Sequence, residues 1–112
     1  MKNLLLCLLL LLASASVEAT ELLIFTASWC GPCQAFKKDL AADPGILAGR
    51  EWGFVDLDTE KELAKAYDVT TVPTFLIIQD HKVVRRLAGY PGPEKLKKWL
   101  NGATMKPTLF RR

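Results

Sequence analysis

The stretch Ala27-Ser28-Trp29-Cys30-Gly31-Pro32-Cys33 decides the fold of this chain. The apolar residues 21–26 before it predict a buried strand, and residues 34–42 after it predict a helix. A Cys-x-x-Cys pair at such a junction places its first thiol at a helix N-terminus, where unpaired N–H groups and the helix dipole favour an anion. We therefore expect the pKa of Cys30 to be lowered, so that Cys30 is a thiolate nucleophile near neutral pH.

The spacing of the two cysteines indicates a redox pair. Cys33 lies one helical turn beyond Cys30, close enough to attack a mixed disulfide that Cys30 has formed. We expect Cys30 to be exposed at the end of the loop and Cys33 to be buried among apolar neighbours. A structural disulfide is a weaker interpretation, because so short a loop removes little unfolded-state entropy. A zinc site needs four ligands, and the chain offers only one more cysteine and one histidine.

The length and charge of the chain limit its functions. With 112 residues it holds one domain at most. Its formal charge of +3 is mild, and the basic residues are spread along the sequence. Nucleic-acid binding therefore has no support.

The N-terminal residues have the pattern of a secretory signal peptide. Lys2 supplies the positive charge, residues 4–12 the apolar core and Ala19 a cleavage site, with a second site after Ala15. The apolar run is too short to span a bilayer. Cleavage also removes the third cysteine and leaves the redox pair alone in a compartment where disulfides persist. We predict a signal peptide over residues 1–19, a domain over 20–103, a loose tail over 104–112 and export, to the periplasm in a Gram-negative bacterium.

The remaining segments alternate between helical and strand patterns. Asp43 can cap a short helical piece, and Thr59 with Glu62 predicts a capping box for a helix over residues 60–67. Asp80-His81 predicts a tight hairpin turn, in which the histidine is a turn residue rather than a ligand. The predicted order is a βαβ unit, a helix and a ββα unit, with further strands at residues 52–58, 75–79 and 82–88 and a last helix over residues 93–102.

Three short motifs together resemble the thioredoxin superfamily over nearly all of the chain after residue 19. Residues 29–33 are similar to the active-site motif of thioredoxin. The run Val72-Pro73-Thr74 is similar to the loop that carries its cis-proline, and Gly89 to the glycine before its last helix.

The resemblance implies roles for residues on both sides of the cysteines. Pro73 would be cis, a state that is essentially confined to proline. The backbone of Val72 would pair with a substrate strand, with Thr71 and Gly89 beside it. The residues implied to support the cysteines are Trp29, Gly31 and Pro32, and Pro32 suits the first turn of a helix because an N–H there is unpaired anyway.

The resemblance also implies an α/β fold, a thioredoxin-like three-layer sandwich with helices on both faces of a mixed sheet. One further N-terminal strand and helix of thioredoxin find no counterpart here, so we expect four strands. A buried aspartate beneath the active site of thioredoxin is replaced by Ile24, and its lysine neighbour by Phe54. We expect these two side chains to form an apolar floor, which leaves the proton acceptor for Cys33 open between solvent and a substrate group.

The function implied by the resemblance is that of an exported thiol:disulfide oxidoreductase, with no cofactor or metal beyond the Cys30–Cys33 disulfide. Its substrates would be disulfides of other exported proteins, and a membrane protein would exchange electrons with it. The Gly-Pro pair favours a reducing potential, near the value of about −270 mV for thioredoxin. Two alternatives stay open: a non-catalytic module that binds or chaperones proteins along the Val72 edge, and a metal-delivery protein, for which a Met-rich or His-rich ligand set is lacking. We expect a monomer.

Overall fold

The computed structural model describes residues 20–103, so the predicted signal peptide and C-terminal tail lie outside the described residues. Within this range the elements follow one another in the predicted order. Their bounds are β1 Thr20–Thr26, α2 Gly31–Ala42, the 3-10 helix η1 Pro44–Leu47, β2 Glu51–Asp56, α3 Lys61–Ala66, β3 Thr74–Gln79, β4 Lys82–Ala88 and α4 Pro93–Ala103. None of the helices in residues 20–103 is long and apolar enough to cross a membrane.

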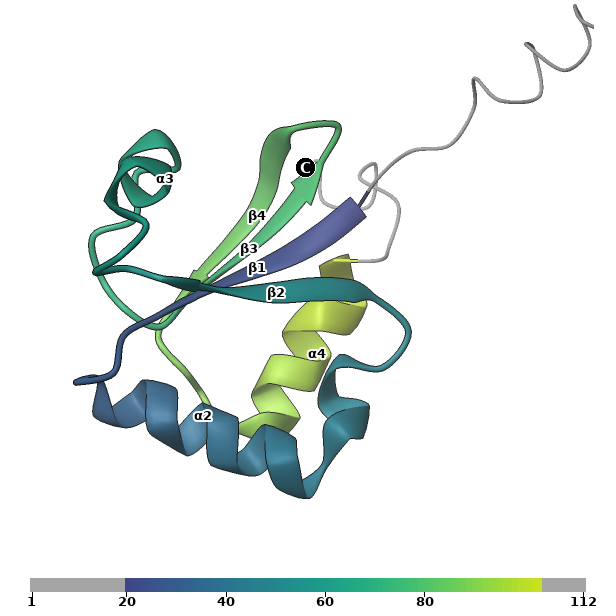
Figure 1. Cartoon of the computed structure of the whole chain (residues 1–112). Coiled ribbons are helices and arrows are strands. Elements are labelled where there is room, and N and C mark those ends of the chain that lie inside the picture. The colour runs from purple at the N-terminus through teal and green to yellow at the C-terminus, as the bar shows by residue number, and fades with distance from the viewer. Residues whose placement is uncertain (1–19, 104–112) are drawn as a thin grey trace, which may run out of the picture.

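The strands form one mixed sheet in the order β2-β1-β3-β4. β1 runs parallel to β2 and antiparallel to β3, which forms a hairpin with β4. Helices α2 and α4 lie on one face of the sheet and α3 on the other (Figure 1). This arrangement confirms the predicted α/β sandwich with a four-stranded sheet and helices on both faces.

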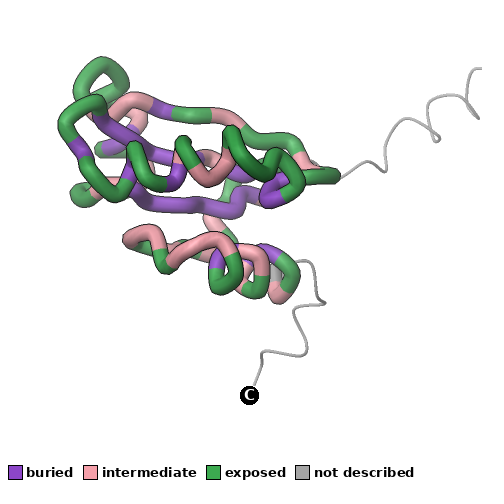
Figure 2. Tube along the Cα trace, turned by 90° about the horizontal axis from the view of Figure 1, so that it is seen from below, coloured by how far each residue is buried: buried purple, intermediate pink, exposed green. Residues whose placement is uncertain are grey.

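Two buried clusters hold the layers together. In the first, Ile24 of β1 packs with Phe36 of α2 and Leu96 of α4. In the second, Phe25 of β1 packs with Ala64 of α3. Successive strand side chains point to opposite faces, so β1 serves both clusters. Figure 2 shows long buried stretches along the strands, whereas the helices are mostly intermediate or exposed along their length.

Two of the predicted turns are confirmed. The carboxylate of Asp43 accepts the N–H of Gly45 at 3.1 Å and so caps η1. Asp80 and His81 have φ values of 54° and 67°, in the left-handed region that a two-residue hairpin turn requires.

The start of α3 differs from the prediction. Thr59 and Glu62 form no capping box, because the helix begins only after Glu60, whose side chain makes no capping hydrogen bond. Instead the carboxylate of Asp56 accepts the backbone N–H groups of Asp58 and Thr59, at 2.8 and 3.3 Å. This local turn competes with both neighbouring elements, so β2 ends two residues earlier than predicted and the helix starts later.

Candidate active site

The junction between β1 and α2 brings the two cysteines together. The N–H of Cys30 donates to the carbonyl of Ala27 at 3.2 Å, which turns the chain after β1 and makes Cys30 the N-cap of α2. The N–H of Cys33 donates to the Sγ of Cys30 at 3.1 Å. A disulfide joins the two cysteines, whose Cα atoms lie 5.2 Å apart. The end of the helix thus directs an N–H group at the Cys30 sulfur, an arrangement that favours a thiolate there once the disulfide is reduced.

The burial of Cys30 differs from the prediction. We expected Cys30 to be exposed, but it is 4% exposed, close to the 1% of Cys33. Both cysteines share a buried cluster with Ala27, and Val72 packs against it. The two thiols therefore differ in their contacts rather than in their burial.

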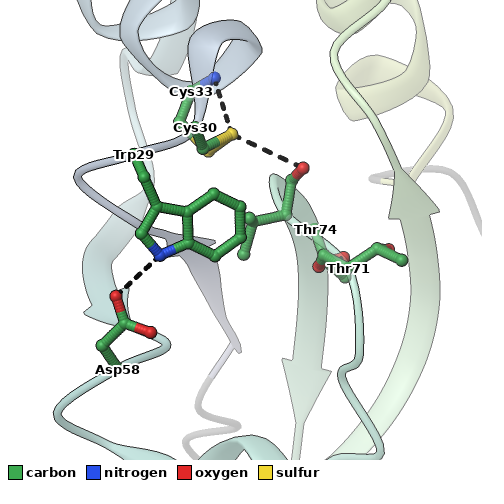
Figure 3. The surroundings of a disulfide bond; sticks show 7 residues. Trp29, Cys30, Cys33, Asp58, Thr71 and Thr74 are labelled. Carbon is green, nitrogen blue, oxygen red and sulfur yellow. Dashed lines mark hydrogen bonds between the residues drawn. A yellow bond between two sulfur atoms is a disulfide. The ribbon is translucent and has the colours of Figure 1, made fainter.

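The loop before β3 lies against the disulfide (Figure 3). Its Val72–Pro73 peptide bond is cis, the state that the resemblance implied. The Sγ of Cys30 lies 3.5 Å from the carbonyl oxygen of Val72, so the reduced thiol can donate a hydrogen bond there. The hydroxyl of Thr74 donates to the carbonyl of Thr71 at 2.7 Å and closes the loop onto the start of β3.

The segment after β4 makes hydrogen bonds both to this loop and to α2. Gly89 has a φ of 88° and donates its N–H to the carbonyl of Pro73 at 2.7 Å. The next residue, Tyr90, donates its hydroxyl to the carboxylate of Asp39 on α2 at 2.7 Å. Burial and this hydrogen bond raise the pKa of Tyr90. The predicted residues Thr71, Val72, Pro73 and Gly89 are therefore brought together on one side of the cysteines.

A carboxylate that the sequence analysis did not select holds the aromatic residue of the motif. Trp29 is 65% exposed, yet its indole N–H donates to the carboxylate of Asp58 at 2.8 Å (Figure 3). Asp58 follows β2, and the turn at Asp56 fixes its backbone. The signal for it was its place two residues after a strand parallel to β1, because the carboxyl ends of parallel strands share one edge of a sheet.

Ile24 and Phe54, the two residues predicted to form an apolar floor, differ in burial. Ile24 is fully buried in the cluster beneath α2, whereas Phe54 is 41% exposed. Phe54 lies beside Ile24 in the sheet, but β2 is an edge strand with a single neighbour, so one side of the ring stays open. The ring packs edge-on against Phe36, and the Nζ of Lys37 lies 5.1 Å from its centroid. Phe54 therefore lies at the open edge of these apolar residues, more exposed than Ile24.

The chemistry available to this site is that of the two sulfurs. Among residues 20–103, no three His, Cys, Asp or Glu side chains come together as possible metal ligands. A Cys-x-x-Cys pair can cycle between disulfide and dithiol, taking up two electrons and two protons.

Comparisons with known proteins agree with this geometry. A model of the thioredoxin-like domain family matches residues 15–104. Thioredoxin H2 from Arabidopsis thaliana is 32% identical over 83 residues, which cover 72% of this chain and 62% of that protein. An H-type thioredoxin from Oryza sativa subsp. indica is 39% identical over 74 residues, which cover 64% of this chain and 61% of the relative. The chain thus spans about six tenths of the length of these two curated relatives.

Solved structures with the same architecture include two thioredoxins. The structure of Fasciola hepatica thioredoxin has a TM-score of 0.65 and 33% identity, and the match covers 75% of this chain and 80% of that one. The thioredoxin from Nicotiana alata has a TM-score of 0.66 and 25% identity, with 86% and 83% covered.

Proposed function

The chain belongs to the thioredoxin-like family, and we propose that it is an exported thiol:disulfide oxidoreductase that reduces or exchanges disulfides of other exported proteins. The observation that carries the proposal is the position of the Cys30–Cys33 disulfide. It lies at the N-terminus of α2 with the carbonyl of Val72 at 3.5 Å, so one sulfur has both an activating N–H and a neighbouring backbone acceptor.

In the proposed reaction, Cys30 is the nucleophile and Cys33 the resolving thiol. The Cys30 thiolate attacks a substrate disulfide, a mixed disulfide forms, and one substrate sulfur leaves as a thiolate. That thiolate takes the proton of Cys33. The Cys33 sulfur then attacks Cys30, the internal disulfide forms, and the second substrate sulfur leaves with the electron pair of the broken bond. The substrate is reduced by two electrons and the protein is oxidised by two.

The substrate would bind as an extended segment beside the cis-proline loop. The carbonyl of Val72 is next to the reacting sulfur, and Thr71 and Gly89 flank it. A substrate backbone N–H paired with such a carbonyl places the residue beside it in reach of Cys30, and main-chain pairing recognises no particular sequence. Trp29 provides an exposed aromatic surface on the other side.

Export is supported by the sequence of residues 1–19 and by the lack of a third cysteine after them. Cleavage after Ala19 would leave β1 intact, because β1 begins at Thr20.

In an oxidising compartment a reducing protein needs a supply of electrons, and we propose a membrane protein as that donor. We further propose a monomer, since a single copy carries both cysteines and the binding loop.

Reduction of insulin by the purified chain tests the activity. We expect turbidity from the released insulin chains with wild type in the presence of a thiol donor, and only the donor's own rate with the Cys30→Ser/Cys33→Ser double variant. Equal rates for the two proteins would favour the alternative of a non-catalytic binding module, and would contradict the proposed activity.

A further inference from the structure

One buried hydroxyl stands out close to the cysteines in the sequence. The side chain of Thr26, 5% exposed, has its Oγ1 fully buried without a hydrogen-bond partner among the described residues. The other buried threonine, Thr74, donates to the carbonyl of Thr71 at 2.7 Å. An unsatisfied buried hydroxyl costs stability, and that cost is removed in any state of the protein that brings a hydrogen-bond partner to it.

The position of Thr26 points to the resolving thiol. Side chains alternate along a strand, so Thr26 shares a face of β1 with Ile24, which packs with Phe36 of α2. α2 runs back beneath β1 (Figure 1), and Cys33 precedes Phe36 by about one turn on the buried side of this helix. Moving from Ile24 to Thr26 along the strand and from Phe36 to Cys33 along the helix leads in the same direction. Thr26 therefore faces the first turn of α2, the turn that holds Cys33.

The charge and hydrogen-bonding capacity of the Cys33 sulfur change with its oxidation state. In the disulfide its sulfur is bonded to Cys30 and carries no charge. After reduction, Cys33 is a thiol or thiolate at a position with 1% exposure, where water cannot solvate it well. The N–H of Cys33 is directed at the sulfur of Cys30, and no donor to the Cys33 sulfur is found among residues 20–103.

We propose that the Thr26 hydroxyl is the hydrogen-bond partner of the Cys33 sulfur in the reduced protein. A hydroxyl can accept from the thiol and donate to the thiolate, and the bond to the charged sulfur is the stronger of the two. Thr26 takes up no proton in this role: the Cys33 proton still passes to the substrate thiolate released in the first step. Thr26 is thus a positioning residue that stabilises the reduced form over the oxidised form. The inference rests on the proposed roles of the two cysteines.

The test compares three variants of the full chain with wild type in a series of glutathione redox buffers at pH 7. Thr26→Val removes the hydroxyl and keeps the volume, Thr26→Ala removes both, and Thr26→Ser keeps the hydroxyl. For Thr26→Val and Thr26→Ala we expect the equilibrium constant for reduction of the disulfide to fall about 3- to 10-fold. This corresponds to a reduction potential ~15–30 mV more negative. The equilibrium constant for reduction of Thr26→Ser should stay within about twofold of the wild-type value.

Unfolding of each redox form provides a second readout that does not depend on exchange with glutathione. Thr26→Val should raise the denaturation midpoint of the oxidised protein, because it removes an unsatisfied hydroxyl, and lower that of the reduced protein. A purely structural role would change both midpoints together. This inference would be overturned if wild type and Thr26→Val had equal equilibrium constants for reduction. It would also be overturned if Thr26→Ser changed that constant as much as Thr26→Val does. Either result would leave the proposed function standing. A wild type that exchanged no thiols with glutathione would overturn both.

Discussion

The indole N–H of Trp29 donates to the carboxylate of Asp58 at 2.8 Å, which links the active-site motif to the end of the neighbouring parallel strand. The residue at one end of this bond is the exposed aromatic group beside the disulfide. The other end is held by the turn at Asp56. The bond therefore sets the orientation of an exposed aromatic side chain next to the disulfide.

Asp58→Ala should release Trp29 and weaken substrate binding. We expect about a 2- to 5-fold loss of kcat/KM in insulin reduction, mainly through a higher KM, because an exposed hydrogen bond of this kind contributes little more. Asp58→Asn is the matched control, since its amide oxygen can still accept the indole N–H. If Asp58→Asn lost as much activity as Asp58→Ala, the charge of Asp58 rather than the orientation of Trp29 would be the cause.

Gly89→Ala should destabilise the fold. Gly89 has a φ of 88°, which costs a residue with a side chain about 1–2 kcal/mol. Gly53→Ala is the control, because Gly53 lies in β2 without a positive φ and with open space around the added Cβ. That change should be neutral or stabilising by about 0.5 kcal/mol. Urea unfolding of both variants measures the difference, and equal destabilisation would show that the strain at Gly89 is not its source.

Tyr90→Phe should lose a pH-dependent part of the stability. The bond from Tyr90 to Asp39 is expected to contribute about 1 kcal/mol to the free energy of unfolding. Because the folded pKa of Tyr90 is raised above 10.0, this contribution is complete below that pH and decreases as the pH rises further. The stability gap between wild type and Tyr90→Phe should therefore be constant from about pH 7 to 9 and narrow above pH 10. A gap that stays constant at high pH would contradict the assignment.

The centre of the fold could be predicted from local sequence patterns. The junction at residues 27–33 places two cysteines on the first turn of a helix, and the structure has this arrangement. The hairpin turn at Asp80 and His81 was equally local, since it depends on two residues that adopt positive φ. Motif and turn chemistry therefore accounted for the order of the elements and for the disulfide at the helix N-terminus.

The features that were missed depend on neighbours far apart in sequence. Asp58 became a partner of Trp29 only because β2 lies beside β1. The exposure of Phe54 follows from the position of β2 at the sheet edge. The capping box predicted at Thr59 follows a local sequence pattern. In the structure, however, the backbone N–H of Thr59 donates to the carboxylate of Asp56 instead. The burial of Cys30 likewise depends on its contact with Val72, 42 residues away.

We propose that Cys30 attacks the substrate disulfide and that Cys33 resolves the mixed disulfide, and trapping of substrates tests this assignment. The N–H of Cys33 is directed at the sulfur of Cys30, so we expect the pKa of Cys30 in the reduced protein to lie below the ordinary thiol value of about 8.5. Cys33 is 1% exposed and its sulfur accepts no such N–H among the described residues, so we propose that it acts on a mixed disulfide that Cys30 has already formed.

The most direct measurement compares Cys33→Ser and Cys30→Ser, each expressed with residues 1–19 in place, on a non-reducing gel. Cys33→Ser should accumulate mixed disulfides with other proteins, because the resolving thiol is gone, and reducing agent should release them. Cys30→Ser should trap little, since the remaining thiol cannot attack first. Equal trapping by the two variants, or trapping by Cys30→Ser alone, would contradict the assignment of Cys30 as nucleophile and Cys33 as resolving thiol.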